Sequence, residues 1–194
     1  MKTIHITKAH DITAFCLSEH EPGPLSGVHY NYKKKRLEAT NRRIMVLMGV
    51  LQKDLGETAG FPTKNCIIPQ SVLKRALSGS GESGVKLRVL RGEMELESDQ
   101  PKTVVSCPKT DEQYPDSEMC LPTSEPTLTM CFSAHYLALL GELAKHVRDN
   151  TQEAHPPVKM EFYGQHMPMK LSATLTGGVP LTALLMPLSI PDKK

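Results

Sequence analysis

One supersecondary pattern occurs three times along this chain of 194 residues, and that repetition constrains the fold more than any single motif does. The pattern is an amphipathic helix followed by further strands in which apolar and polar residues alternate. In the last two copies an apolar strand precedes the helix. Its last copy predicts a helix over 133–148 among strands 127–132, 158–163, 167–175 and 180–187. This βαβββ order is typical of an α+β fold, in which helices pack on antiparallel sheets.

The helix over 133–148 has a residue suited to capping at its start, Ser133. Its apolar residues recur at helical spacing and define one stripe, which we expect to face the core. This stripe contains Leu137, Leu140, Ala144 and Val147.

The middle copy predicts a strand over 66–68, a helix over 70–78, a hairpin over 85–97 and a strand over 102–107. Pro69 stands where proline commonly opens a helix. We expect the apolar side of this helix to pack inward, with Lys74, Arg75 and Ser78 facing elsewhere. The residues on its apolar side are Val72, Leu73, Ala76 and Leu77.

The first copy predicts a helix over 7–20, a hairpin over 27–40 and a strand over 43–50, followed by a polar loop over 52–64. Thr7 can cap this helix, and Glu21-Pro22-Gly23-Pro24 ends it. Its inward face is expected to carry Ile12, Phe15 and Cys16. The turn of the hairpin is basic, Lys33-Lys34-Lys35-Arg36.

Composition narrows the classes of function. The formal charge of +2 is too small to indicate a nucleic-acid partner by itself, and aromatic residues at 5% without tryptophan argue against a stacking platform for single strands. The five cysteines show no metal-ligand spacing, so we expect buried free thiols, as at Cys66 and Cys131, and a reducing cytoplasm. We expect neither a signal peptide nor a membrane span.

The sequence contains no recognisable catalytic motif. The eight histidines are scattered, without an HExxH pattern, and the glycine-rich stretch 79–84 lacks the Lys-Ser/Thr of a phosphate-binding loop. We therefore predict that the protein is not an enzyme and uses no cofactor or metal. Residues 108–126, rich in Pro, Asp, Glu and Ser, are expected to link a domain over 1–122 to a smaller one over 123–194.

Several short motifs, in this order, resemble one family. Ala39-Thr40-Asn41 after the first hairpin resembles an Ala-Thr-Asp motif, and Gln113-Tyr114-Pro115-Asp116 resembles a Phe-Pro-Asp crossover. Met130-Cys131-Phe132-Ser133-Ala134-His135-Tyr136-Leu137 resembles a Gly-Phe-Asn-x-x-Tyr-Leu start, and Leu184-Leu185-Met186-Pro187-Leu188 resembles a Val-Val-Met-Pro-Met end. These are motifs of the bacterial DNA polymerase III beta subunit, the sliding clamp.

The resemblance implies a DNA-clamp-like fold. A clamp subunit of that family contains six βα units, whereas three are recognisable here. Residues 1–122 resemble its complete middle domain, and 123–194 resemble the C-terminal half of its last domain.

The resemblance also implies a face of helix-borne cations that binds duplex DNA without sequence preference, because phosphate neutralisation alone suffices. The alternative is that these side chains belong to ordinary solvated helix faces. The basic turn at 33–36 is a further candidate, although charged hairpin tips commonly serve solubility. The helix-borne candidates are Lys8, Lys74, Arg75, Lys145 and Arg148, together with His10 and His146.

Partner proteins of such clamps dock a short peptide in an apolar pocket, and a methionine-rich wall suits varied ligands. The alternative is that the same residues are simply core. Arg42 and Arg43 replace a Gly-His-like stretch of the family, which changes the polarity beside the pocket. The expected wall residues are Leu25, Thr40, Met45, Pro115, Met119, Cys120, Leu184 and Met186.

The sequence thus supports two functional hypotheses. The first is a processivity or tethering factor that binds duplex DNA and holds a DNA polymerase or another replication protein through a peptide motif. The second is a clamp-derived interaction module, an adaptor or decoy, that does not encircle DNA. We expect a homodimer through residues 127–187, because its third βα unit lacks a partner unit, and a tetrameric ring as a less favoured assembly.

Overall fold

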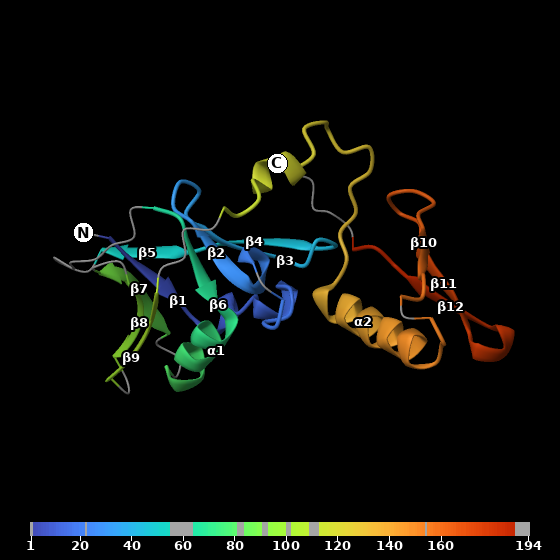
Figure 1. Cartoon of the computed structure of the whole chain (residues 1–194). Coiled ribbons are helices and arrows are strands. Elements are labelled where there is room, and N and C mark those ends of the chain that lie inside the picture. The colour runs from blue at the N-terminus through green and yellow to red at the C-terminus, as the bar shows by residue number, and fades with distance from the viewer. Residues whose placement is uncertain are drawn as a thin grey trace. The chain divides into compact units, whose positions relative to one another are not determined.

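A computed structural model describes residues 2–21, 23–54, 64–80, 84–90, 93–99, 102–108, 113–153 and 155–188. The chain forms two compact units, Met1–Leu121 (unit 1) and Pro122–Lys194 (unit 2). Unit 1 contains β1 (Lys2–Ile6), β2 (Gly27–Asn31), β3 (Arg36–Thr40), β4 (Met45–Gly49), β5 (Leu51–Asp54), β6 (Cys66–Pro69), α1 (Gln70–Gly79), β7 (Val85–Leu90), β8 (Glu93–Asp99) and β9 (Lys102–Pro108). Unit 2 contains α2 (Ala134–Asp149), β10 (Lys159–Glu161), β11 (Met169–Leu175) and β12 (Val179–Leu185) (Figure 1).

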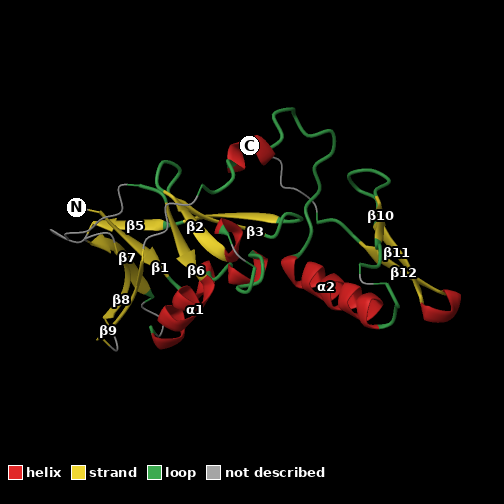
Figure 2. Ribbon diagram, viewed as in Figure 1, coloured by secondary structure: helices red, strands yellow, loops and turns green. Residues whose placement is uncertain are grey.

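Short 3-10 helices complete the elements: η1 (Lys8–His10), η2 (Thr13–Phe15), η3 (Pro24–Ser26) and η4 (Ser117–Cys120) in unit 1, and η5 (Thr176–Gly178) in unit 2. All strand pairs among the described residues are antiparallel, in the orders β5-β1-β7-β8-β9, β4-β3-β2-β6 and β10-β11-β12. Figure 2 shows this mixture of sheets and few helices. The predicted α+β class is therefore confirmed.

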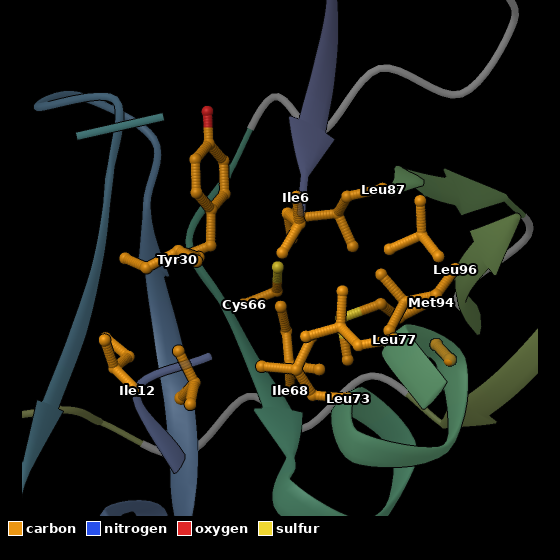
Figure 3. Packing of buried hydrophobic residues seen from close by; sticks show 14 of the residues in the cluster. Ile6, Ile12, Tyr30, Cys66, Ile68, Leu73, Leu77, Leu87, Met94 and Leu96 are labelled. Atoms are coloured by element: carbon orange, nitrogen blue, oxygen red, sulfur yellow. The ribbon is translucent and has the colours of Figure 1, made fainter. Parts of the chain in front are cut away.

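The two sheets of unit 1 share one core. Leu73 and Leu77 of α1 are fully or almost fully buried and meet Ile68 of β6, Leu87 of β7 and Leu96 of β8 (Figure 3). The helix forms here because its apolar residues fall on one side at helical spacing, after Pro69 at the N-cap. The predicted helix 70–78 and the hairpin 85–97 are confirmed to within a residue or two at the ends.

The predicted helix over 7–20 is wrong. The chain forms η1 and η2 instead, since local side chains compete with helical hydrogen bonds. Asp11 Oδ1 accepts from the Thr13 backbone N–H and hydroxyl at 3.1 and 2.6 Å, and His10 folds back on Thr7. Ile12 and Cys16 are nevertheless buried, so the predicted inward face is right although the helix is not.

Two strands were not foreseen. β1 pairs with β5 from Lys2↔Asp54 to His5↔Leu51, so the first residues of the predicted loop 52–64 are strand, and residues 55–63 lie outside the described part. Alternation of Ile4 and Ile6, both fully buried, was the signal for β1.

In unit 2, α2 begins after Ser133, as predicted, and contacts β11. Val147 is buried, Leu140 and Ala144 are half-buried, and Leu137 is exposed, so only part of the predicted stripe is covered. The predicted strand 127–132 is wrong, because its sole ladder contact among the described residues is the bridge Cys131↔Leu188. Cys131 is also exposed, contrary to expectation.

Candidate functional site

Two of the cations predicted to face DNA lie on the outer side of α1 in unit 1. Lys74 and Arg75 are exposed there, whereas Leu73 and Leu77 are buried. Burial raises the pKa of the Cys16 thiol to about 11, against an opposing effect of the Lys74 charge, so Lys74 lies near the segment that precedes β2. The outer side of α1 thus presents two adjacent cations to solvent.

Lys8 lies on the η1 turn and not on a helix, but it is exposed. His10 is buried, and its Nδ1 lies 3.1 Å from the Thr7 backbone nitrogen and 2.9 Å from Thr7 Oγ1. These contacts make His10 part of the turn, so its prediction as a DNA-facing residue is wrong. Lys8 remains a candidate.

In unit 2, Lys145, His146 and Arg148 are exposed on α2. Arg148 Nη2 lies 2.9 Å from Asp149 Oδ1, in a pair whose side chains are both more than half exposed. Solvent screens such a pair, so Arg148 keeps much of its capacity to meet a phosphate.

The basic hairpin turn is largely committed to contacts within unit 1. Lys34 Nζ lies 3.0 Å from Glu118 Oε2, and Arg36 bonds both Glu38 and Glu118. Lys35 Nζ lies 3.4 Å from the centre of the Tyr32 ring. These contacts make the turn a docking point for the segment around Glu118 and a weaker candidate for DNA than the helix faces.

A buried carboxylate organises this docking point. Glu38 Oε1 accepts hydrogen bonds from Arg36 Nε at 2.8 Å and Ser117 Oγ at 2.7 Å, while Oε2 lies 2.8 Å from His29 Nδ1. Asn31 Nδ2 donates to Oε1 at 3.1 Å. Burial alone would raise the pKa of Glu38, but the hydrogen bonds from His29, Arg36 and Ser117 lower this pKa to about 2. The carboxylate is therefore ionised whenever the protein is folded near neutral pH.

The crossover segment 113–121 is fastened to the β2–β3 hairpin by this network. The Tyr114 ring stacks on His29, with centroids 4.4 Å apart and planes 12° apart, and its hydroxyl donates to the Glu38 carbonyl at 3.5 Å. Asp116 caps η4 by accepting from the Glu118 N–H. We call the segment 113–121 the strap.

The strap carries three of the predicted pocket residues. Pro115, Met119 and Cys120 are all exposed, and Met119 is 86% exposed. A methionine this exposed is not a core residue, which removes the alternative interpretation for that position.

The other predicted wall residues of unit 1 differ in burial. Thr40 is buried and pairs across the strands with half-buried Met45, while Leu25 is half-buried on η3. For Thr40 the side chain has a structural role, since its hydroxyl donates to the Ile44 carbonyl at 2.7 Å and accepts from the Arg42 N–H at 3.1 Å.

The loop after Thr40 holds Arg42 in the left-handed region, at φ 72°. Asn41 Oδ1 fixes this loop by accepting from the backbone N–H groups of Arg43 and Ile44, both at 3.1 Å. Arg42 and Arg43 are exposed and Ile44 is 46% exposed, so the loop offers two cations and an apolar side chain beside Thr40.

In unit 2, Leu184 and Met186 are 67% and 61% exposed, at the end of β12. Neither is a core residue, in agreement with a binding role. Assembly of the eight residues into one pocket remains a prediction, because they are divided between the units. A hollow among the described residues lies elsewhere in unit 2, lined by parts of 151–159 and 172–182, and includes neither side chain.

Within the described ranges, His, Cys, Asp and Glu side chains form no cluster that could hold a metal ion. A search of the same residues finds no helix long and apolar enough to cross a bilayer.

Comparison with known proteins identifies the fold. No protein-family model and no curated protein matches the chain. The beta subunit of DNA polymerase from Streptococcus pyogenes matches with a TM-score of 0.70 at 18% identity, over 93% of this chain and 47% of that one. The Bacillus subtilis sliding clamp (0.71, 15%, 96% and 49%) and the Caulobacter crescentus beta sliding clamp (0.67, 17%, 95% and 50%) match similarly. The predicted resemblance is confirmed as a sliding-clamp fold, and the chain spans about half the length of these clamps.

Proposed function

We propose that this chain, which has the fold of bacterial DNA polymerase sliding clamps, binds duplex DNA without sequence preference and tethers a partner protein through a short peptide. The observation that carries the proposal is the match to these clamps over 93–97% of the chain. We assign the chain no catalytic activity, because its sequence contains no recognisable catalytic motif.

The exposed helix faces support the DNA-binding half of the proposal. Lys74 and Arg75 on α1, and Lys145 and Arg148 on α2, project from rigid elements, with Lys8 on η1 as a fifth cation. Lysine and arginine side chains on helices can neutralise phosphates without reading bases, as non-specific binding requires.

Combined Lys74→Glu, Arg75→Glu and Lys145→Glu should weaken binding to a duplex oligonucleotide and flatten its salt dependence. Loss of three phosphate contacts should reduce the slope of log K against log salt by roughly three. Fluorescence anisotropy between 50 and 200 mM salt measures both effects. The single variants Lys74→Glu and Lys64→Glu form a matched pair, since Lys64 is exposed but lies outside the helices. An unchanged affinity and slope in the triple variant would refute this DNA face, and the turn around Lys33 would be tested next.

Met119, Leu184 and Met186 support the peptide-binding half, because all three are exposed and so open to a ligand. A contiguous apolar patch formed by them would mark an interaction surface. Met186→Lys should weaken binding of a clamp-motif peptide by about 2 kcal/mol or more if the methionine anchors the peptide. Isothermal titration calorimetry measures this loss. Met167→Lys is the control, since Met167 is also exposed in unit 2 but lies outside the predicted pocket. Equal affinity of both variants would contradict the assignment.

A second candidate function is an adaptor or decoy that binds the same peptides without encircling DNA. The observation that favours it is that Lys34 and Arg36 of the basic turn pair with Glu118 and Glu38 and are thus committed to contacts within unit 1. Peptide binding without measurable duplex binding would identify this function. For the tethering function we propose a homo-oligomer, in which two chains supply as many βα units as one clamp subunit.

A further inference from the structure

Unit 2 exposes most of its large apolar side chains, whereas unit 1 buries most of its own. Among the described residues, nineteen apolar side chains of unit 1 are buried and only four of unit 2: Val147, Met169, Leu171 and Leu185. The exposed large apolar side chains show the reverse, with four in unit 1 and twelve in unit 2. Unit 2 therefore has the surface of an incomplete domain.

Unit 1 shows how such a domain is completed, because it consists of two similar halves. One half is β1, the η1–η2 turns and β2-β3-β4; the other is β6, α1 and β7-β8-β9. The first strand of each half pairs with a strand of the other half, namely the strand that directly follows the helix or turns there. Thus β1 pairs with β7, and β6 pairs with β2, both antiparallel. The two halves thus exchange strands reciprocally, as a twofold axis would.

Unit 2 repeats one such half without its counterpart. Segment 127–132, α2 and β10-β11-β12 follow the order of β6, α1 and β7-β8-β9. Within the described part, β10 pairs with β11 alone, and segment 127–132 makes only the Cys131↔Leu188 bridge. The two edges that are cross-paired in unit 1 are thus the two edges left open in unit 2.

We propose that a second copy of this chain completes unit 2, with segment 127–132 of each copy pairing antiparallel with β10 of the other. This inference rests on the homo-oligomer of the proposed function and names its surface. A second copy fits because the counterpart half in unit 1 has the same order of strands, with the η1–η2 turns in place of the helix, and because a reciprocal exchange closes as an isologous dimer. Residues 127–133 contain no charged side chain, and on β10 Lys159 Nζ lies 2.7 Å from Glu161 Oε1, so pairing these two edges buries no unpaired charge.

Unit 1 also fixes the expected register. In each half the residue before the N-cap pairs with a valine, Ile6 with Val85 and Ile68 with Val28. Each of these valines stands two residues before a residue that faces the core. In unit 2 the N-cap is Ser133, and Met160, which is 52% exposed, lies on the same face of the sheet as its buried cross-strand partner Leu171. The equivalent pairs across the dimer are therefore Phe132 with Val158, Cys131 with Lys159, and Met130 with Met160.

The same arrangement covers the N-terminal half of α2, where Tyr136, Leu137 and Leu139 are 52%, 47% and 53% exposed. Their counterpart in unit 1 is the flank of α1, which η2 of the other half contacts. In unit 2 the pairs Glu161↔Lys170 and Met169↔Leu185, with the Cys131↔Leu188 bridge, bring the end of β10 and the start of α2 to the same end of the unit. The β10 edge and the exposed N-terminal half of α2 therefore lie on one side of unit 2, where a single second copy can cover both.

The oligomeric state of the full chain tests the proposal. Light scattering after size exclusion should show a dimer at micromolar concentration. Tyr136→Glu with Leu139→Glu should raise the dimer dissociation constant at least about thirtyfold, since both side chains would sit in the dry interface. Leu184→Glu is the control, because Leu184 lies on the opposite face of the sheet, beside Lys170. A monomeric wild type, or a dimer that the double variant leaves intact, would overturn the proposal.

A disulfide tests the register directly. In a Cys120→Ser background, Lys159→Cys should form an interchain disulfide with Cys131 on mild oxidation, because directly opposed residues bring Cβ atoms within about 5 Å. Lys170→Cys should not, because β11 lies one strand further away. Cross-linking that is equal in both variants, or absent from the first, would refute the register.

These outcomes are separable from failure of the proposed function. If the chain is always monomeric but binds the peptide, and Met186→Lys abolishes that binding, then the proposed function stands and the proposed dimer is refuted. A dimer that dissociates as predicted, but binds neither peptide nor duplex, would do the opposite.

Discussion

The Glu38 network predicts a definite loss of stability when its charge is removed. Glu38 is fully buried, and His29, Asn31, Arg36 and Ser117 all direct donors at its carboxylate. A pKa of about 2 against an ordinary value of 4.5 corresponds to about 3 kcal/mol of stability at neutral pH. Glu38→Gln removes this contribution and also turns an amide N–H₂ toward donors, so we expect a loss of about 3 kcal/mol or slightly more.

The pH dependence gives the sharper test. Because the folded-state pKa is depressed, the contribution is fully present above the unfolded value of 4.5 and is lost as pH falls from there toward 2. The difference in unfolding free energy between wild type and Glu38→Gln should therefore be largest near pH 7 and shrink between pH 5 and 3. Urea unfolding followed by far-ultraviolet circular dichroism at several pH values measures this difference.

A variant on the strap provides the control. Glu118→Gln also removes a carboxylate that pairs with Arg36, but Glu118 is exposed, so its effect at pH 7 should be much smaller than that of Glu38→Gln. Equal effects of the two variants, or a Glu38→Gln loss below about 1 kcal/mol, would refute the view that the buried carboxylate holds the strap. Faster hydrogen exchange at 113–121 in Glu38→Gln alone would connect the network to the position of Met119.

Two further predictions concern unit 1. Leu73→Ala should destabilise it by about 3 kcal/mol in thermal or urea unfolding, since Leu73 is fully buried in the shared core, whereas Val72→Ala at the half-buried neighbour should lose roughly 1 kcal/mol. Arg42→Gly should be neutral or stabilising by up to about 1 kcal/mol, because φ is 72° there, while Arg42→Val should destabilise by about 1–2 kcal/mol. A large loss in Arg42→Gly would show that the loop needs the arginine side chain.

Local patterns predicted the elements that depend on short-range periodicity. Helix α1 and the β7–β8 hairpin follow directly from Leu73 and Leu77 at helical spacing and from strict alternation over 85–90. The helix predicted over 7–20 failed although Ile12 and Cys16 do face the core, because the same spacing also fits two 3-10 turns. Asp11 and Thr13, which favour local side-chain hydrogen bonds, were the available warning.

The Glu38 network could not be predicted in the same way. Its Ser117 partner is 79 residues away in sequence, and a hydrogen bond at that separation leaves no periodic signal. A weaker sign was present, since Glu38 stands between Leu37 and Ala39 in a strand whose other residues are largely apolar or buried. A charge at such a position indicates a partner but does not identify it. For the candidate site, the sequence named single residues, and the structure shows Met119, Met186 and the cations of α1 and α2 to be exposed. Their assembly into one site stays a prediction.

Segment 127–132 shows why a correct pattern can give a wrong strand. Leu128, Met130 and Phe132 alternate with polar or small residues, as in a half-buried strand, and the segment leads into a helix as β6 does. Such a pattern reports only that a segment is suited to pairing; a strand also needs a neighbouring edge. In unit 1 that edge is supplied by the other half, and for unit 2 the described residues contain only Leu188 in that role. The discrepancy between pattern and structure therefore has the same physical cause as the exposed side of α2, and pairing with a second copy would resolve both.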